Sequence, residues 1–344
     1  MTIRRRLGAA TAAALCLAFA APASAQGVLN VYCSVQVEWC TLLANEFQKA
    51  SGTKVSITQK GSGETIAQLK AEAQNPKGDV WFGGTGDPHL QAAEEGLTEV
   101  YKSPKLGELY PWAVKQNTDS GGKTVGIYAG ALGYGFNTEL LAKKNVKAPA
   151  CWADLLKPEL KGEIQDANPN SSGTAYVAIA TLVQLMGEEK AFDYLKKMHA
   201  NVNAYTRSGT APMKAVARGE TAVSISFAHD GVTEALAGFP VKTATPCEGT
   251  GYEIGSMSIV KGARNAANAR KFYDWALTPE AQKLEAQAKQ FQVPSNKNTP
   301  VPPEAPKFAD MKLIDYDQAK YGKSAERKRL IARWDAEVGA LPKP

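Results

Sequence analysis

The sequence lacks a strong excess of charge of either sign. It contains 40 Lys and Arg residues against 34 Asp and Glu residues, which gives a formal net charge of +6 at pH 7. Three of the arginines stand at positions 4–6, so the rest of the chain carries only a mild, dispersed positive charge. Domains that bind nucleic acid usually concentrate Lys and Arg in a patch or stripe. We therefore expect no nucleic-acid partner.

The sequence is also poor in the residues that metal sites and many enzymes require. It has three histidines, and no two cysteines have the Cys-x-x-Cys spacing of zinc sites. The sequence also lacks the Gly-x-Ser-x-Gly turn that presents the nucleophile of many hydrolases. It therefore predicts a protein that is not an enzyme and that uses no metal and no cofactor.

Long apolar runs are missing except near the N-terminus. Arg4, Arg5 and Arg6 precede the apolar segment "LGAATAAALCLAFAA", and the small residues "ASA" end this region at position 25. This order is typical of a secretory signal peptide, whereas a membrane span needs about 20 apolar residues. We expect residues 1–25 to be removed on export, which leaves a soluble protein in the periplasm.

Four of the five cysteines follow the predicted cleavage site: Cys33, Cys40, Cys151 and Cys247. An even number of cysteines in an oxidising compartment favours disulfide bonds over free thiols. Four cysteines allow three pairings, and we favour Cys33–Cys40 with Cys151–Cys247 because the first two are close in sequence. A zinc site is the competing interpretation, which the spacing and the few histidines disfavour.

Short apolar segments alternate with helical patterns early in the mature chain. The segments "GVLNVYCSV", "TKVSITQK" and "GDVWFGG" are each typical of a strand, and each precedes a stretch with helical periodicity. Strands that alternate with helices predict an α/β fold with a mainly parallel sheet flanked by helices.

Two apolar stretches rich in glycine, "KTVGIYAGALGYGFNTELL" and "GTGYEIGSMSIVKGA", interrupt this pattern. They predict two extended strands that cross between two lobes, with the second lobe inserted into the first. Lobe one would comprise residues 27–127 and 256–344, and lobe two residues 128–255. A ligand would then bind in the cleft between the lobes, beyond the carboxyl ends of the strands.

Small hydroxyl residues and glycines stand where predicted strands end and helices begin. The candidates in lobe one are Ser34, Ser62 and Thr85, and those in lobe two are Ser171, Ser172, Gly173 and Thr174. The unpaired N–H groups and partial positive charge of a helix N-terminus bind anions. The same residue types are also ordinary helix caps. Their repetition in both predicted lobes favours an anion site.

The segment "SISFAHDG" ends in His229, Asp230 and a glycine, and Glu253 stands inside the second crossing. A catalytic dyad would also need a nucleophile, and a metal site would need further ligands. A histidine paired with its own neighbour and a hinge salt bridge are the structural interpretations, beside ligand binding. An imidazole and carboxylates accept hydrogen bonds from hydroxyls, and the Ser/Thr loops suit an anion. Both sets together favour a phosphorylated sugar.

Several segments resemble a known family. "GDVWFGG", "CWADLLKPELKGEIQDANPNSSGTAY", "KAVARGETAVSISFAHD" and "KFYDWALTPEAQ" look like the extracellular solute-binding proteins of ABC importers, in the branch often labelled ferric-iron-binding. The resemblance covers almost the whole mature chain. It implies the two-lobed type II periplasmic-binding fold, closure around a ligand and docking to a membrane permease.

The iron binders of this branch carry two adjacent tyrosines where this chain has His229 and Asp230. The His-Asp pair followed by a Glu is instead similar to the hexose-phosphate-binding members. That similarity implies that His229, Asp230 and Glu253 contact sugar hydroxyls. It assigns the phosphate and ring contacts to small residues of both lobes: Ser34, Ser62, Thr85, Ser172, Gly173 and Thr174. Arg207, in "YTRSGTAP", is either a further ligand contact or a surface residue at the start of a helix.

The resulting hypothesis is a monomeric periplasmic receptor that captures a phosphorylated sugar or related organophosphate and delivers it to an ABC permease. A ferric-ion or iron-chelate receptor of the same fold is one alternative. A 2-aminoethylphosphonate receptor is another, because its ammonium group would suit Asp230 and Glu253. A secreted phosphoester hydrolase that uses His229 and Asp230 as a base is the alternative from a different class.

Overall fold

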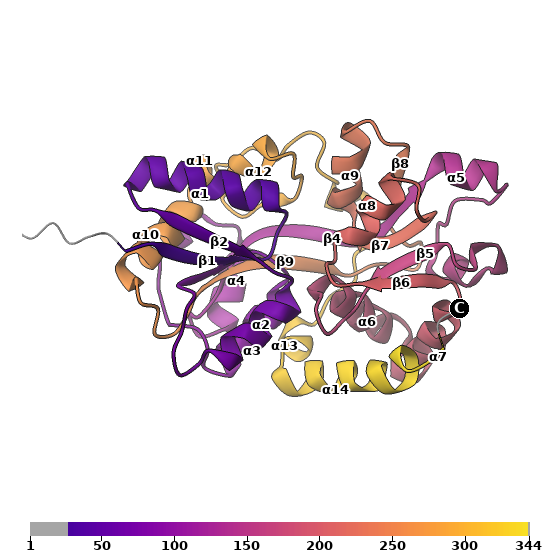
Figure 1. Cartoon of the computed structure of the whole chain (residues 1–344), viewed down its shortest axis with the longest axis horizontal. Coiled ribbons are helices and arrows are strands. Elements are labelled where there is room, and N and C mark those ends of the chain that lie inside the picture. The colour runs from indigo at the N-terminus through magenta and orange to yellow at the C-terminus, as the bar shows by residue number, and fades with distance from the viewer. Residues whose placement is uncertain (1–26, 343–344) are drawn as a thin grey trace, which may run out of the picture.

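The computed structural model describes residues 27–342, so the predicted signal peptide lies outside the described residues. Its strands form one mixed sheet in the order β2-β1-β3-β9-β4-β7-β5-β6, with β8 and β10 paired to β4. Strands β4 (Val125–Asn137) and β9 (Tyr252–Ile259) run through the centre and connect the two ends of the molecule (Figure 1). None of the helices within 27–342 has the length and apolar character that a membrane crossing requires.

The N-terminal strands build one lobe. Strand β1 (Leu29–Cys33) pairs in parallel with β2 (Val55–Gln59) and β3 (Val80–Phe82), as the alternation of strands and helices predicts. The short β10 (Val293–Pro294) adds an antiparallel edge beside β4. The helices of this lobe are α1 (Val37–Ser51), α2 (Ser62–Ala71), α3 (Gly86–Glu94), α4 (Pro111–Asp119), α10 (Ala266–Ala276), α11 (Pro279–Gln282) and α12 (Leu284–Gln287).

The middle of the chain builds the other lobe. Its sheet contains β5 (Ile164–Ala167), which lies in parallel between β6 (Val202–Thr206) and β7 (Val223–Phe227), while β8 (Val241–Ala244) pairs with β4. Its helices are α5 (Thr138–Lys143), α6 (Gly173–Met186), α7 (Glu188–His199), α8 (Ala211–Ala217) and α9 (Ala228–Leu236). Short 3₁₀ turns cover Leu106–Glu108, Trp152–Leu156, Pro158–Leu160 and Phe308–Asp310.

The two crossing strands explain why the glycine-rich stretches are so apolar. Every residue of β4 is buried, and its first half pairs with β9 whereas its second half pairs with β7 and β8. Separate clusters of buried apolar side chains lie on either side of this crossing. A strand covered on both faces is expected to be continuously apolar. The predicted fold class, two α/β lobes joined by two crossing strands, is confirmed.

The C-terminal segment differs from the sequence-based lobe boundary, which placed all of 256–344 in lobe one. Helices α13 (Gln318–Tyr321) and α14 (Ser324–Trp334) and a final π-helical turn, Asp335–Gly339, follow the last lobe-one strand, and α14 runs along the bottom of the molecule in Figure 1. Leu330 and Trp334 are buried in the core of lobe two.

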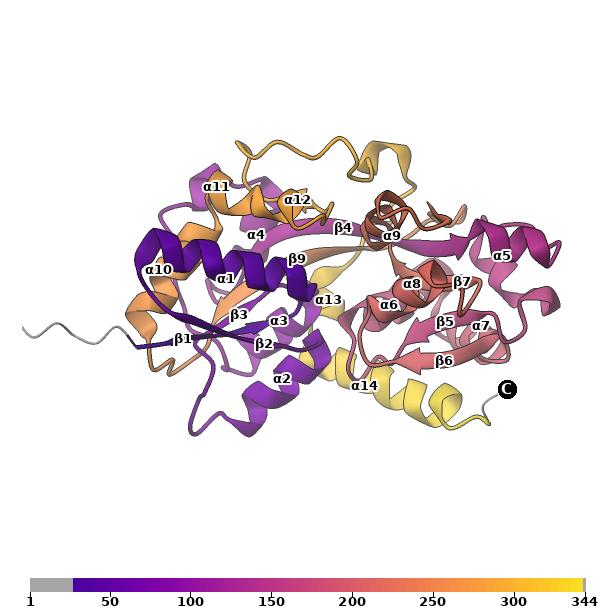
Figure 2. The ribbon, with the colours of Figure 1, turned by 45° about the horizontal axis from the view of Figure 1, so that its top comes forward.

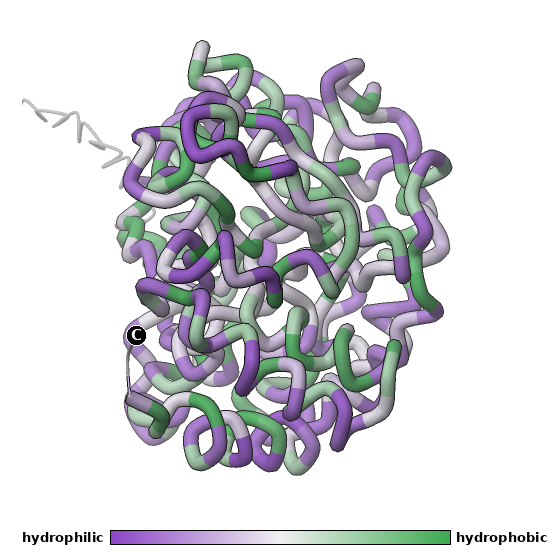
Figure 3. The backbone as a smooth tube through the Cα atoms, turned by 90° about the vertical axis from the view of Figure 1, so that its right-hand side faces the viewer, coloured by the Kyte–Doolittle hydropathy of each residue, from purple (hydrophilic) through white to green (hydrophobic). Residues whose placement is uncertain are grey.

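Ion pairs add to this attachment of α14. Arg329 and Arg333 pair with Glu188 at the start of α7, at 2.7 and 2.8 Å. Turns of the outer helices alternate between hydrophilic and hydrophobic residues (Figure 3), which is the pattern of helices that pack on one face. This alternation shows that a helix has a buried face, but it does not show which lobe that face packs against. We propose that the chain from Ile314 onward belongs to lobe two.

Both predicted disulfide bonds are present. Cys33 and Cys40 join the end of β1 to the first turns of α1. Cys151 and Cys247, which are 96 positions apart, join the region after α5 to the segment that leads into β9. Next to this second bond, Glu248 accepts hydrogen bonds from the backbone N–H groups of Trp152 and Ala153, at 2.8 and 3.2 Å. These hydrogen bonds therefore hold the segments around Cys151 and Cys247 together in addition to the disulfide bond.

Replacing both Cys151 and Cys247 by alanine should lower the free energy of unfolding by about 4 kcal/mol, because the bond closes a long loop and restricts the unfolded chain. The Glu248 contacts should keep the local native structure intact. Urea unfolding of the variant and of the parent protein under non-reducing conditions measures the difference. Equal midpoints would show that the bond does not stabilise the protein.

Candidate ligand-binding cleft

A cavity lies between the two lobes, at the carboxyl ends of β1, β3 and β7. The volume of this cavity is about 50 Å³, and the space counted out into its opening is about 510 Å³. The sequence-predicted residues that line it are Ser34, Ser62, Thr85, Ser172, Gly173, Thr174, His229, Asp230 and Glu253. Residues from distant parts of the sequence therefore face one space, and their role in binding stays a prediction.

Ser171 differs from the other candidates, because it lies beside the cavity and is not part of its wall. Its hydroxyl donates to the backbone oxygen of Arg207 at 2.8 Å. Its own backbone oxygen accepts from the N–H group of Gly63 in the opposite lobe at 3.1 Å. Ser171 therefore connects the lobes at the edge of the cavity, and its side chain is not free to contact a ligand.

Six helices of the described chain begin at residues that line the cavity, namely α1, α2, α3, α6, α8 and α9, and three of them carry the predicted hydroxyl and glycine residues. Helix α2 begins at Ser62, α3 begins directly after Thr85, and α6 begins directly after Ser172. The Ser172 hydroxyl accepts from the N–H group of Ala175 at 3.4 Å, so this residue also acts as the helix cap that its type suggests. Thr85 makes no such capping bond. The N-termini of helices from both lobes thus converge on one space, which favours an anion there.

Thr85 and Gly173 bring α3 and α6 into direct contact across the cleft. A Cβ atom on Gly173 would lie 1.9 Å from the Thr85 hydroxyl oxygen, so only glycine permits this approach. The same hydroxyl is buried and has no hydrogen-bond partner among the described residues. A buried polar atom without a partner is costly. It is therefore a candidate contact for a ligand.

The second group of polar side chains that line the cavity consists of His229, Asp230 and Glu253. Asp230, in the first turn of α9, accepts hydrogen bonds from the Gln36 amide at 2.6 Å and from the Ser226 hydroxyl at 2.7 Å. His229 Nε2 lies 3.8 Å from the nearer Asp230 oxygen, which is too long for a hydrogen bond. The Nδ1 atom of His229 is buried without a partner. The interpretation of His229 as a histidine satisfied by its neighbour is therefore wrong.

Glu253 lies in the crossing strand β9 and is 4% exposed. Within residues 27–342 it forms no salt bridge, so the hinge-salt-bridge interpretation fails. Burial raises the pKa of Glu253 well above its usual value, and the neighbouring Asp230 carboxylate raises it further. This shift favours the protonated form of Glu253, which can both donate and accept a hydrogen bond.

Burial also sets the charge of the His-Asp pair. It lowers the pKa of His229 to about 3, so the imidazole is neutral and offers one donor and one acceptor. It raises the pKa of Asp230 to about 7, so this carboxyl group is only partly ionised near neutral pH. The carboxyl groups of the cavity wall therefore oppose an anionic ligand less than their residue types suggest.

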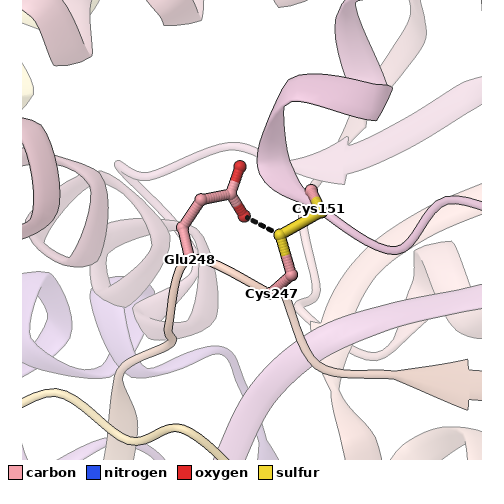
Figure 4. Close-up of side chains that lie close together, drawn as sticks. All are labelled: Cys151, Cys247 and Glu248. Atoms are coloured by element: carbon pink, nitrogen blue, oxygen red, sulfur yellow. Dashed lines mark hydrogen bonds between the residues drawn. A yellow bond between two sulfur atoms is a disulfide. The ribbon is translucent and has the colours of Figure 1, made fainter.

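Metal-ligating side chains do not gather in this cavity. Among the described residues, the group of three or more His, Cys, Asp or Glu side chains close enough to share an ion consists of Cys151, Cys247 and Glu248 (Figure 4). The figure shows the two sulfur atoms joined in a disulfide, so neither is a free thiolate. This group lies in lobe two and is not part of the cleft.

The chain resembles known proteins over most of its length. Residues 79–321 match the family described as bacterial extracellular solute-binding protein. An uncharacterised protein of Haemophilus influenzae is 47% identical over 94% of both chains. The periplasmic binding protein AfuA of Actinobacillus pleuropneumoniae, whose structure holds exogenous fructose-6-phosphate, is 46% identical to this chain. The two structures have a TM-score of 0.88, and the match covers 92% of this chain and 100% of AfuA. An Fe(3+)-binding periplasmic protein of Serratia marcescens is 29% identical over 61% of this chain and 60% of its own.

The chain belongs to the bacterial extracellular solute-binding proteins. The predicted family resemblance is confirmed, and so is the two-lobed type II fold that it implies. In this solute-binding protein the lobes are in contact at the edges of the cavity. Arg207 forms an ion pair with Glu64 of the opposite lobe, and the Arg207 side chain is 85% exposed, so it lies at the rim and does not line the cavity.

The solute-binding protein also lines its cavity with residues that the sequence analysis missed. These residues are Val35, Gln36, Gln59, Lys60, Gly61, Gly84, Tyr128, Ser208, Gly209, Thr210, Phe227 and Gln292. The segment 208–210 precedes helix α8 and has the hydroxyl-and-glycine composition of the loops that were selected, so the same criterion could have found it. Gln36 and Gln292 belong to no motif, and only the fold places them here.

Stability should depend on pH through Asp230. Its pKa rises from 3.8 to about 7 on folding, so the folded protein binds the extra proton and this group makes the protein less stable as pH rises through that interval. The variant Asp230→Asn removes that contribution, which is at most about 4 kcal/mol. Melting temperatures at a series of pH values should therefore fall less steeply for the variant than for the parent.

The variant Asp166→Asn is the matched control for this experiment. Asp166 is also buried with a pKa raised to about 7, but it lies in β5 and does not line the ligand cavity. It should flatten the pH profile in the same way, because burial alone raises the pKa of each group. An unchanged profile for Asp230→Asn, with a flatter one for Asp166→Asn, would show that Asp230 is ionised in the folded protein.

Proposed function

We propose that the protein captures a phosphorylated sugar or a related organophosphate in the cleft between its lobes and delivers it to the membrane permease of an ABC importer. The observation that carries this proposal is the composition of the cavity wall. Helix N-termini from both lobes meet there, and a neutral imidazole and two carboxyl groups stand in the same wall. Binding is the whole function in this proposal, and no bond of the ligand is broken.

The helix N-termini are the proposed site of the phosphate group. Ser62, Thr85, Ser172 and Thr174 offer hydroxyls beside the starts of α2, α3 and α6. Backbone N–H groups at a helix N-terminus can hold a phosphate without a basic side chain. Lys60 also lines the cavity and adds one positive charge. The unpaired Thr85 hydroxyl would gain the partner that it lacks in the ligand-free protein.

The other end of the cavity is the proposed site of the sugar. His229, Asp230 and Glu253 provide acceptors for hydroxyl groups, and the neutral His229 and protonated Glu253 also provide donors. Inorganic phosphate would leave these groups without partners. A hydroxylated organophosphate satisfies both ends of the cavity, which is why we favour it. The AfuA structure with fructose-6-phosphate supports the same class of ligand.

Contacts between the lobes support closure around the ligand. The Gly63 N–H group donates to the Ser171 backbone oxygen at 3.1 Å, and the Gln36 amide donates to Asp230 at 2.6 Å. A ligand that contacts both walls would favour this closed arrangement over an open one. We further propose that the closed form is the one that a permease recognises, and that the predicted signal peptide directs the protein to the periplasm as a monomer.

A ferric-ion receptor is less well supported by the cavity. A hard trivalent ion prefers anionic oxygen ligands. Tyr32 and Tyr205 do not line the cavity, and the Tyr32 hydroxyl donates to Glu72 at 2.7 Å. Tyr128 does line it, but burial raises its pKa well above the usual value and its oxygen accepts from the Gly84 N–H group at 3.0 Å. Protonated oxygens make a poor iron site.

A thermal-shift screen tests the ligand class. Fructose 6-phosphate should raise the melting temperature strongly, and inorganic phosphate should raise it little, because only the ester reaches both groups of polar side chains. The screen should also contain 2-aminoethylphosphonate and ferric citrate. A response to ferric citrate with a visible charge-transfer band, and none to the phosphate esters, would overturn the proposal in favour of iron. A response to the phosphonate alone would identify that ligand instead.

Three variants test which residues bind. Asp230→Ala should weaken fructose 6-phosphate binding, measured by calorimetry, by about 10- to 100-fold, because it removes an acceptor from a buried hydrogen-bonding site. Ser172→Ala should weaken binding by about tenfold. Ser171→Ala is the matched control, since Ser171 lies outside the cavity wall. Equal losses for the two serine variants would contradict the proposed site.

A further inference from the structure

A second cavity adjoins the ligand cavity. It lies between the start of α1, helices α8 and α9, and the residues after α12, and Figures 1 and 2 show these elements near one another. The empty space, counted to its opening, is about 650 Å³. Gln36, Thr210 and Asp230 line both cavities. We call the second one the outer cavity.

The hydrogen bond between Gln36 and Asp230 stands between the two cavities. It is 2.6 Å long, both side chains are buried, and they belong to opposite lobes. Asp230 is fixed by a second bond from Ser226 at 2.7 Å. Gln36 occupies the cap position of α1, yet its side chain makes no capping bond. Its amide therefore serves the contact with Asp230 and not the helix.

The outer cavity offers polar groups that lack partners. Gln290 is 2% exposed, and its side-chain oxygen is buried without a hydrogen bond. Glu38, Glu234, Lys214 and Lys289 also line this space, and none of them has a counter-ion within 4.0 Å in the described part of the chain. Unpaired acceptors and cations suit a group with several hydroxyls, which both donates and accepts hydrogen bonds.

We propose that Gln36 sets the length of ligand that the protein accepts, by closing the ligand cavity against the outer cavity. This inference rests on the proposed function. The phosphate lies at the helix N-termini in that proposal, so the far end of the sugar lies at Asp230. A substituent on that end, such as a second sugar, has to pass between Gln36 and Asp230. Without the Gln36 amide the two cavities join, and the outer cavity becomes a subsite for the second sugar.

The test compares two ligands on four proteins. Fructose 6-phosphate and the disaccharide trehalose 6-phosphate are titrated by calorimetry into the parent protein and into Gln36→Ser. Serine is shorter than glutamine and is a preferred cap, so the start of α1 should be preserved. The double variant Gln36→Ser/Ala237→Trp refills the mouth of the outer cavity from the exposed residue Ala237. Gln292→Ala is the matched control, because Gln292 lines the ligand cavity but not the outer one.

Gln36→Ser should shift the ratio of the two affinities toward trehalose 6-phosphate by at least about tenfold, because a ligand that was excluded by a side chain now fits. The double variant should reverse most of that shift, and Gln292→Ala should weaken both ligands alike. Should Gln36→Ser not fold, as judged by circular dichroism, Gln36→Ala serves for the same comparison.

A ratio within about twofold of the parent's in a folded variant overturns the inference while the proposed function stands. A shift of the same size in Gln292→Ala overturns it too, because the effect would then not be specific to Gln36. If the parent protein binds no phosphate ester at all, the proposed function fails, and the inference fails with it.

Discussion

The cost of burying unpaired polar groups is the constraint on which this structure depends. Among residues 27–342, the Thr85 hydroxyl and His229 Nδ1 are buried and have no hydrogen-bond partner, and the almost fully buried Glu253 has no salt bridge. Each such group lowers the stability of the closed form by about 1–3 kcal/mol. A ligand that supplies the missing hydrogen bonds removes this cost only when both lobes surround it. In the proposed function, the same unpaired polar atoms are therefore responsible for both ligand recognition and closure of the lobes. A molecule that forms hydrogen bonds with only half of these atoms favours closure less.

The glycines of the crossing strands make this arrangement possible. Gly130 in β4 pairs with Glu253 in β9, and a Cβ atom on Gly130 would lie 2.6 Å from His229 Nδ1. The imidazole can therefore stand directly over the strand, near the carboxyl group of the neighbouring one. Gly135 has a similar role farther along β4, where a Cβ atom would lie 2.1 Å from the Met213 sulfur. The glycine-rich stretch that marks the crossing in the sequence is thus also what allows His229 to stand beside Glu253.

Much of the fold follows from local pattern, because strand and helix periods and the even cysteine count act over short distances. The loops at Ser62, Thr85 and Ser172 were found for the same reason: hydroxyl residues before a helix are a local signal. Gln36 was missed because its partner Asp230 is 194 positions away, and no local pattern encodes that distance. The sequence analysis placed the C-terminal helix in lobe one, whereas we propose lobe two. The reason for this difference is related, since the apolar face that contains Leu330 matches either core. Periodicity specifies that a face is buried, whereas only the assembled lobes specify what covers it.

In the proposed function, the protonation state of the cleft favours one class of ligand among those that its residue types allow. If both carboxyl groups were ionised, Asp230 and Glu253 would suit a cation such as ferric iron or an ammonium group. Burial raises the pKa of both groups, that of Asp230 to about 7, and this reduces the negative charge that would attract a cation. The helix N-termini keep their partial positive charge, because it resides in the backbone and does not titrate. The balance of charge in the closed cavity is therefore positive at the helix starts and close to neutral elsewhere. A molecule with one anionic end and one neutral hydroxylated end fits that balance at both places.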